Sequence, residues 1–188
     1  MRSNVAFIVL AVALAACGQQ NASKGASEPA QLDSPSSDTN PARSFNPVSD
    51  SARAASGTLT VTIATRLPDA GAANADAQET LTLHGVNGFN VDAQITSTAS
   101  PATQVQGQTL RALLNLPVEA QEVLVYHAGA ETKPAGGQGL CGAETTQYVV
   151  VWEPSDPGAT AMKVMGVSGG APGAASAHAC PVLEYQRA

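Results

Sequence analysis

Basic residues are scarce in this chain of 188 residues, which carries 9 lysines and arginines against 15 aspartates and glutamates. The formal net charge at pH 7 is −6, and no segment gathers the basic residues into a cluster. A protein that binds nucleic acid needs such a cluster to neutralise phosphates. The composition therefore excludes nucleic acid as a partner.

Charged and aromatic residues are also few, at 13% and 4% of the sequence. The charged fraction is about half the quarter that is usual for a globular protein. Glycine and proline are plentiful instead, with 17 and 12 copies. This balance favours short strands and loops over long helices stabilised by surface ion pairs.

The apolar run at residues 5–16 has twelve residues, too few for a membrane-spanning helix. As a helix it would rise about 18 Å, against a hydrocarbon layer of roughly 30 Å. The run follows the positive charge of Arg2 and leads through small residues into Cys17, which is the layout of a secretory signal. We therefore predict a signal peptide over residues 1–16.

The end of this segment, Leu14, Ala15, Ala16 and Cys17, resembles the lipobox of bacterial lipoproteins. In that family the cysteine thiol receives a diacylglyceryl group, cleavage falls just before the cysteine, and the new amino group is usually acylated. The resemblance implies that Cys17 is a lipid anchor and that one partner is a membrane. Because Gly18 rather than aspartate follows, it also implies an outer-membrane location facing the periplasm. The alternatives are a secreted protein cleaved nearby and an uncleaved anchor.

Residues 17–56 consist mostly of small and polar residues, and their only large apolar side chains are Leu32, Phe45 and Val48. Three such groups cannot offset the entropy lost on ordering the segment. We predict a disordered tether with a reach of roughly 35 Å, and the alternative is a segment that binds a partner. The remainder, residues 57–188, is predicted to form a single β-rich globular domain.

Apolar and polar residues alternate strictly over residues 58–65, and again over residues 80–84 and 91–96. This period of two is typical of strands with one buried face. The glycine-rich stretch between the second and third runs, residues 85–88, predicts a hairpin turn.

The register of this hairpin follows from which residues can share a face. A two-residue loop would place Leu83 opposite Asp92, mixing apolar and polar side chains on one face. A three-residue loop over residues 86–88, with Gly88 left-handed, places Leu83 opposite Val91 and keeps one face apolar. We expect the longer loop.

Further along, Thr109 is placed to cap a short helix in which Leu110, Leu113 and Leu114 share a face, and Pro117 ends the run. Further strands are predicted over residues 123–126, 148–152, 162–167 and 182–186. Many short strands with glycine- and proline-rich connections predict a mainly β fold, either an antiparallel sandwich or an open barrel, with one short helix.

With Cys17 lipidated, Cys141 and Cys180 remain in an oxidising compartment, where an even pair normally closes. We predict a structural disulfide between them, and the alternatives are a redox-active pair or reduced or metal-bound thiols. This bridge would hold two glycine-rich stretches near each other, and these stretches form the candidate binding surface unless they are disordered. The candidate residues are Lys133, Gly137, Gly139, Gly142, Ser168, Gly169, Gly170 and Gly173.

Several patterns resemble catalytic or metal sites without the context that such sites require. They are the Gly-x-Gly-x-x-Gly spacing of Gly137, Gly139 and Gly142; the residues around Ser168, similar to the nucleophile loop of chymotrypsin-like proteases; the histidines His84, His127 and His178; and the carboxylates Glu119 and Glu122. Phosphate binding needs a strand before the glycines and a helix after them. The chymotrypsin-like fold needs two barrels, more than this domain can hold. The histidines are not spaced as metal ligands usually are. We expect no catalytic residue, no metal and no cofactor.

The leading functional hypothesis is a non-catalytic, lipid-anchored envelope protein whose domain binds an envelope or host protein or serves a structural role. The second is a periplasmic inhibitor of a cationic hydrolase such as lysozyme, because an acidic domain would be steered towards a basic enzyme. An enzyme with an inconspicuous cleft and a metal carrier are the remaining alternatives.

Overall fold

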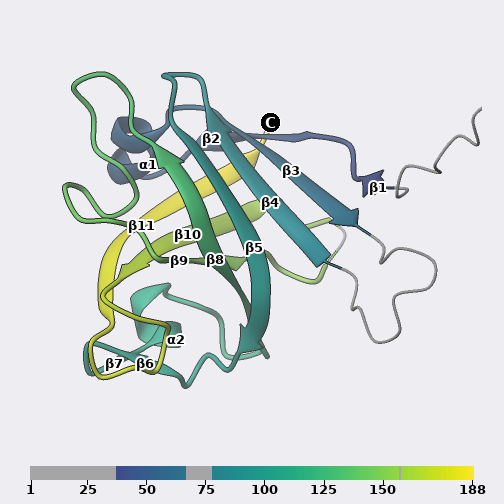
Figure 1. Cartoon of the computed structure of the whole chain (residues 1–188). Coiled ribbons are helices and arrows are strands. Elements are labelled where there is room, and N and C mark those ends of the chain that lie inside the picture. The colour runs from purple at the N-terminus through teal and green to yellow at the C-terminus, as the bar shows by residue number, and fades with distance from the viewer. Residues whose placement is uncertain (1–36, 67–77, 157) are drawn as a thin grey trace, which may run out of the picture. The chain divides into compact units, whose positions relative to one another are not determined.

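The computed structural model describes residues 37–66, 78–156 and 158–188 (Figure 1). The predicted signal peptide, Cys17 and the first part of the predicted tether lie outside this range. The strands are β1 (Ser37–Thr39), β2 (Arg43–Pro47), β3 (Leu59–Arg66), β4 (Gln78–Gly85), β5 (Asn90–Ala99), β6 (Gln104–Val105), β7 (Gln108–Thr109), β8 (Val123–Thr132), β9 (Tyr148–Trp152), β10 (Ala161–Ser168) and β11 (His178–Arg187). The helices are α1 (Asp50–Ala55) and α2 (Leu110–Leu113).

Eight antiparallel strands form a closed barrel. Hydrogen-bonded neighbours follow the order β3, β2, β11, β10, β9, β8, β5 and β4, and β4 pairs with β3 again. The short strand β1 continues the line of β2 along β3, since Thr39 is opposite Ala64 and Arg43 is opposite Val61. The predicted mainly β antiparallel class is confirmed, and the barrel is closed because each of its eight strands is paired on both sides.

The ordered domain begins earlier than the predicted boundary at residue 57. Residues 43–56 form β2 and α1, and β2 pairs with both β3 and β11. Phe45, assigned to the tether from its surroundings, is 1% exposed in the barrel core. The prediction that the tether runs to residue 56 is therefore wrong, because ladder hydrogen bonds and one buried aromatic ring order a segment whose composition is that of a linker.

The β4–β5 hairpin has the predicted register. Leu83 lies opposite Val91 and Leu81 opposite Ala93. Gly88 has a φ of +89°, which is left-handed as expected, and the Gly85 amide donates to the Phe89 carbonyl at 2.9 Å to close the turn. Keeping one face apolar was sufficient to select the three-residue loop.

The predicted short helix is present as α2. The Thr109 hydroxyl accepts a hydrogen bond from the Ala112 amide at 3.2 Å, which confirms the expected cap. Together with β6 and β7, this helix lies outside the barrel wall, at the lower left of Figure 1. The other helix, α1, was not predicted, because it lies within the segment assigned to the tether.

The inner face of the barrel forms one hydrophobic core, which includes Leu59, Leu83, Val149 and Val151. A second core lies on the outer face, where Val150 and Trp152 of β9 pack with Leu110 and Leu114 of the α2 segment. Strand β9 is therefore buried on both faces. This burial explains why residues 148–152 form a continuous apolar run rather than an alternating one.

Candidate functional site

Helix α1 closes one end of the barrel. Ala52 and Ala55 of this helix are buried in the inner core, and Ala55 also contacts the β4–β5 turn, since its carbonyl accepts from the Asn87 side chain at 3.0 Å. Figure 1 shows the helix beside this end of the strands. Leu140, from the connection between β8 and β9, is buried in the same core.

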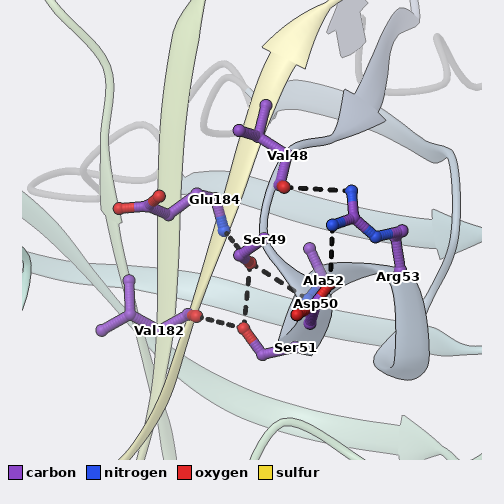
Figure 2. A network of polar contacts seen from close by, with 8 residues as sticks. All are labelled: Val48, Ser49, Asp50, Ser51, Ala52, Arg53, Val182 and Glu184. Carbon is purple, nitrogen blue, oxygen red and sulfur yellow. Dashed lines mark hydrogen bonds and ion pairs between the residues drawn. The ribbon is translucent and has the colours of Figure 1, made fainter.

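A polar network fixes α1 against β11 (Figure 2). The Ser49 hydroxyl oxygen accepts from the amides of Ala52 at 3.2 Å and Glu184 at 3.1 Å, so it caps the helix and joins it to the strand at once. Ser51 donates to the Val182 carbonyl at 2.6 Å and lies 2.9 Å from the Ser49 oxygen. Because the Ser51 proton is used on Val182, the Ser49 hydroxyl must be the donor between the two serines.

A buried pair of hydroxyl groups lies behind this network. The hydroxyls of Ser56 and Tyr185 are 2.7 Å apart, and the two residues are 0% and 2% exposed. Burial raises the pKa of Tyr185 to about 12, and the hydrogen bond to Ser56 partly opposes that shift. This end of the barrel is therefore packed and hydrogen-bonded rather than hollow.

The opposite end of the barrel holds a cavity of about 880 Å³. We call it the mouth. It is bounded by residues of β2, β3, β8 and β9, by residues 117 and 119–122, and by the connection after β9. Its apolar lining includes Ile63, Pro117, Leu124, Val151, Trp152 and Pro154. Its charged lining consists of Arg43, Glu119, Glu122, Glu153 and Asp156.

Arg43 and Glu153 form an ion pair within the mouth. The Arg43 Nη1 and Nη2 atoms donate to the two Glu153 carboxylate oxygens at 2.5 and 2.8 Å. Their side chains are 28% and 27% exposed, and the guanidinium carbon lies 5.4 Å from the centre of the Phe45 ring. A bidentate pair of this kind fixes both side chains in position.

Tyr126 and Glu79 form a second polar pair near the first. The Tyr126 hydroxyl donates to the Glu79 Oε1 atom at 2.7 Å. Burial is the largest cause that raises the pKa of Tyr126, followed by its hydrogen bond to Glu79 and the charges of Glu79 and Glu153, whereas the charge of Arg43 lowers it. Tyr126 therefore lies within electrostatic reach of both Glu79 and the Arg43–Glu153 pair.

Two basic side chains hold the outer wall of the mouth. Arg111 donates to the Ala120 carbonyl at 2.9 Å and also to the Pro117 carbonyl. Lys163 of β10 donates to the Leu114 carbonyl at 2.8 Å, just after α2. Arg111 thus connects residues 117–120 to α2, and Lys163 connects the end of α2 to the barrel. These hydrogen bonds give the mouth a defined shape.

The predicted disulfide is present, with the sulfurs of Cys141 and Cys180 1.94 Å apart. Cys180 lies at a bulge of β11 that faces Gly166 of β10. A Cβ atom on Gly166 would lie 2.7 Å from the Cys141 sulfur and 2.8 Å from the Leu140 Cβ. The absence of a side chain at residue 166 therefore makes room for the bridge.

The first predicted binding loop, residues 133–142, forms several hydrogen bonds within itself. Lys133 donates to the Gly142 carbonyl at 2.7 Å, and Gly139 and Gly142 form an isolated bridge. Gly137 closes a turn through its amide, 2.9 Å from the Pro134 carbonyl. None of these residues lines the mouth.

The second predicted loop touches the first only near its base. Ser168 is 4% exposed and donates to the Glu144 carboxylate. Gly169 and Gly170 turn tightly against the backbone and side chain of Ser176. Gly173 donates to the Gln104 carbonyl at 3.0 Å, so the loop continues towards β6. The role of the two loops as a binding surface stays a prediction.

The three histidines are separate and exposed. The ring of His127 meets Tyr148 edge-on, with centroids 5.2 Å apart, while His84 lies on β4 and His178 on β11. In the described parts of the chain, no group of three or more His, Cys, Asp or Glu side chains is placed to hold a metal ion. Glu119 and Glu122 belong to the outer wall of the mouth and not to a helix.

Sequence reasoning missed the polar groups of the mouth, although the sequence carries a signal for them. Arg43, Glu79 and Glu153 each lie two residues from an inward core residue, so each continues the apolar face of its strand. A charged residue that continues the two-residue spacing of inward-facing side chains, at the end of a strand, indicates the rim of a barrel.

Among the described residues, no helix is long and apolar enough to cross a membrane. A scan of protein families, a search of curated proteins and a search of solved structures found no match to this chain.

Proposed function

We propose that this protein is a lipid-anchored envelope protein whose barrel binds a ligand at the mouth without transforming it. The observation that carries the proposal is the difference between the two ends of the barrel. One end is filled by α1, and the other holds a cavity of about 880 Å³. Cavities of roughly 300 to 1,000 Å³ with an apolar lining and a few fixed polar groups are typical of small-molecule sites.

The state of the polar groups favours binding over catalysis. Arg43 is paired with Glu153, and the Tyr126 hydroxyl is donated to Glu79. A nucleophile needs an adjacent base that can take its proton and must also reach the ligand. Ser168 has a carboxylate beside it in Glu144, but its hydroxyl is buried and lies away from the mouth. These groups are arranged to orient a ligand.

The chain enters the barrel at the mouth. Strand β1 pairs with the last residues of β3, and the Asn40 amide donates to the carbonyl of Ile63, which lines the cavity. With Cys17 acylated, nineteen residues separate the anchor from β1. Even fully extended, a stretch of that length spans no more than about 70 Å, which limits how far from the membrane surface the mouth could work.

Two measurements test this proposal. Mass spectrometry of the protein purified from membranes should find an acylated amino-terminal Cys17. Native mass spectrometry should find a small molecule bound to the natural chain and absent from a Leu124→Trp variant, in which the larger ring fills the mouth. A bare thiol at Cys17 would contradict the anchor, and equal ligand content in both chains would contradict the site.

A second candidate function is inhibition of a cationic hydrolase. Residues 117–122 present Val118, which is 87% exposed, beside the exposed carboxylates of Glu119 and Glu122. An apolar side chain flanked by negative charge is suited to a basic protein surface. Inhibition of lysozyme by the purified protein, lost in a Val118→Asp variant, would favour this function over the first.

A further inference from the structure

We infer that the ligand of the mouth is an organic cation, namely an amine or ammonium group carried on an apolar body. This inference rests on the proposed function and specifies the chemistry of its ligand. It follows from the balance of charge, from the pairing of the one arginine in the lining, and from the position of Trp152.

The lining of the mouth is strongly acidic. One arginine faces four carboxylates there, and Glu79 lies just beyond them beside Tyr126. Arg66 and Arg187, which end β3 and β11, are exposed and do not line the cavity. A recess with low-dielectric walls concentrates the field of such charges and attracts ions of opposite sign.

The arginine of the lining does not offer a site for an anion. Both terminal nitrogens of Arg43 already donate to Glu153, so an anionic ligand would have to displace a bidentate carboxylate. By contrast, Glu119, Glu122 and Asp156 are absent from the three ion pairs found among the described residues. The guanidinium of Arg111 also lies at this rim, where it donates to the carbonyls of Pro117 and Ala120. The three unpaired carboxylates outnumber it, so the net charge at the rim is negative.

The remaining lining suits the rest of such a ligand. Ile63, Leu124 and Val151 give the cavity an apolar floor, and Trp152 contributes to its wall. An aromatic face attracts a cation as well as apolar groups. A ligand with an apolar body and one positive group therefore satisfies both parts of the mouth, whereas an apolar anion satisfies only one.

The test uses three probes that share a phenyl body and differ in charge: 2-phenylethylammonium, 2-phenylethanol and 3-phenylpropanoate. The acylated full-length protein is held on phosphatidylcholine vesicles, which carry no net charge. Trp152 is the only tryptophan of the chain, so its fluorescence reports on the mouth. We expect the cation to bind about tenfold or more tightly than the alcohol, and the anion to bind more weakly than either.

A paired set of variants locates the effect. Replacing Glu119→Gln and Glu122→Gln together should weaken binding of the cation about three- to tenfold and leave the alcohol within about twofold. The control, Asp50→Asn with Asp92→Asn, makes the same change of net charge at two exposed positions that do not line the mouth, and it should leave both probes unchanged. An equal loss in the control would overturn the inference, because the effect would then come from net charge alone.

The failure of the inference differs from the failure of the proposed function. If the three probes bind equally, or if the anion binds most tightly, the mouth is a ligand site but the assignment of a cation is wrong. If neither the alcohol nor the cation changes the Trp152 fluorescence, both the site and its assigned ligand are contradicted.

Discussion

The guanidinium of Arg43 and the carboxylate of Glu153 meet through two hydrogen bonds although the residues lie 110 positions apart in the chain. Arg43 opens β2 and Glu153 follows β9 directly. The pair therefore connects two strands that are not neighbours in the barrel and holds the rim of the mouth in a defined shape.

We expect Arg43→Gln to lower the free energy of unfolding by about 1 to 3 kcal/mol, because it leaves a half-buried carboxylate without its partner. Urea unfolding measures this loss. The double variant Arg43→Gln with Glu153→Gln should recover part of it, since no unpaired charge remains. A double variant less stable than the single one would contradict this account of the pair.

Replacing Gly166 tests the space around the disulfide. The new Cβ of Gly166→Ala would meet the Cys141 sulfur and the Leu140 Cβ at less than 3 Å, so we expect a loss of about 1 to 3 kcal/mol. Gly158→Ala is the matched control, because its Cβ would have only the Asp156 side chain near, at 3.5 Å. The two unfolding midpoints in urea should differ clearly.

The disulfide itself closes a loop across 39 positions. A cross-link of that span stabilises the folded state by about 4 kcal/mol in the loop-entropy description. We expect the Cys141→Ala and Cys180→Ala double variant to lose roughly that amount. A loss of less than about 1 kcal/mol would mean that the chain gains little from the bridge.

The cap at Ser49 serves a helix and a strand with one oxygen atom. Ser49→Ala removes the acceptor for the amides of both Ala52 and Glu184. We expect it to cost about 1 to 2 kcal/mol, with faster amide exchange in α1. Ser44→Ala, at an exposed position of β2, should change stability by less than about 0.5 kcal/mol.

Stability at alkaline pH should depend on Tyr185. Burial raises its pKa from 10.0 to about 12, so the folded state holds this proton more tightly than the unfolded chain does. The resulting stabilisation is fully present below pH 10 and is lost as pH rises from 10 to 12. Unfolding measured across this range should show the loss in the natural chain and a smaller loss in Tyr185→Phe. Equal slopes for the two proteins would contradict the assignment.

The sequence predicts those parts of the fold that depend on local patterns. Alternation around Leu83 is sufficient for the hairpin register, and the hydroxyl of Thr109 is sufficient for the cap of α2. The small and polar neighbours of Phe45 predict a tether, and nothing local reveals that its strand pairs with residues 59–61 and 185–187. Contacts between distant segments decide that boundary.

The same reasoning explains what could be predicted of the candidate site. The pairing of Cys141 with Cys180 follows from counting cysteines once Cys17 is set aside as the predicted lipid anchor. The mouth does not, because Arg43 and Glu153 in its lining, and the neighbouring pair of Tyr126 and Glu79, come together only when the barrel closes. The composition of the glycine-rich loops predicts a binding surface, yet the Lys133 amine and the Gly137 amide donate within their own loop.

Trp152 belongs both to the outer hydrophobic core and to the lining of the mouth. One indole ring therefore separates the outer hydrophobic core from the cavity and contacts both. Since protein interiors are close-packed, a change in side-chain volume in the outer core shifts the indole ring and so changes the shape of the cavity. Substitutions beneath α2, such as at Leu114, would then alter what the mouth accepts, although they lie outside the barrel and touch no ligand.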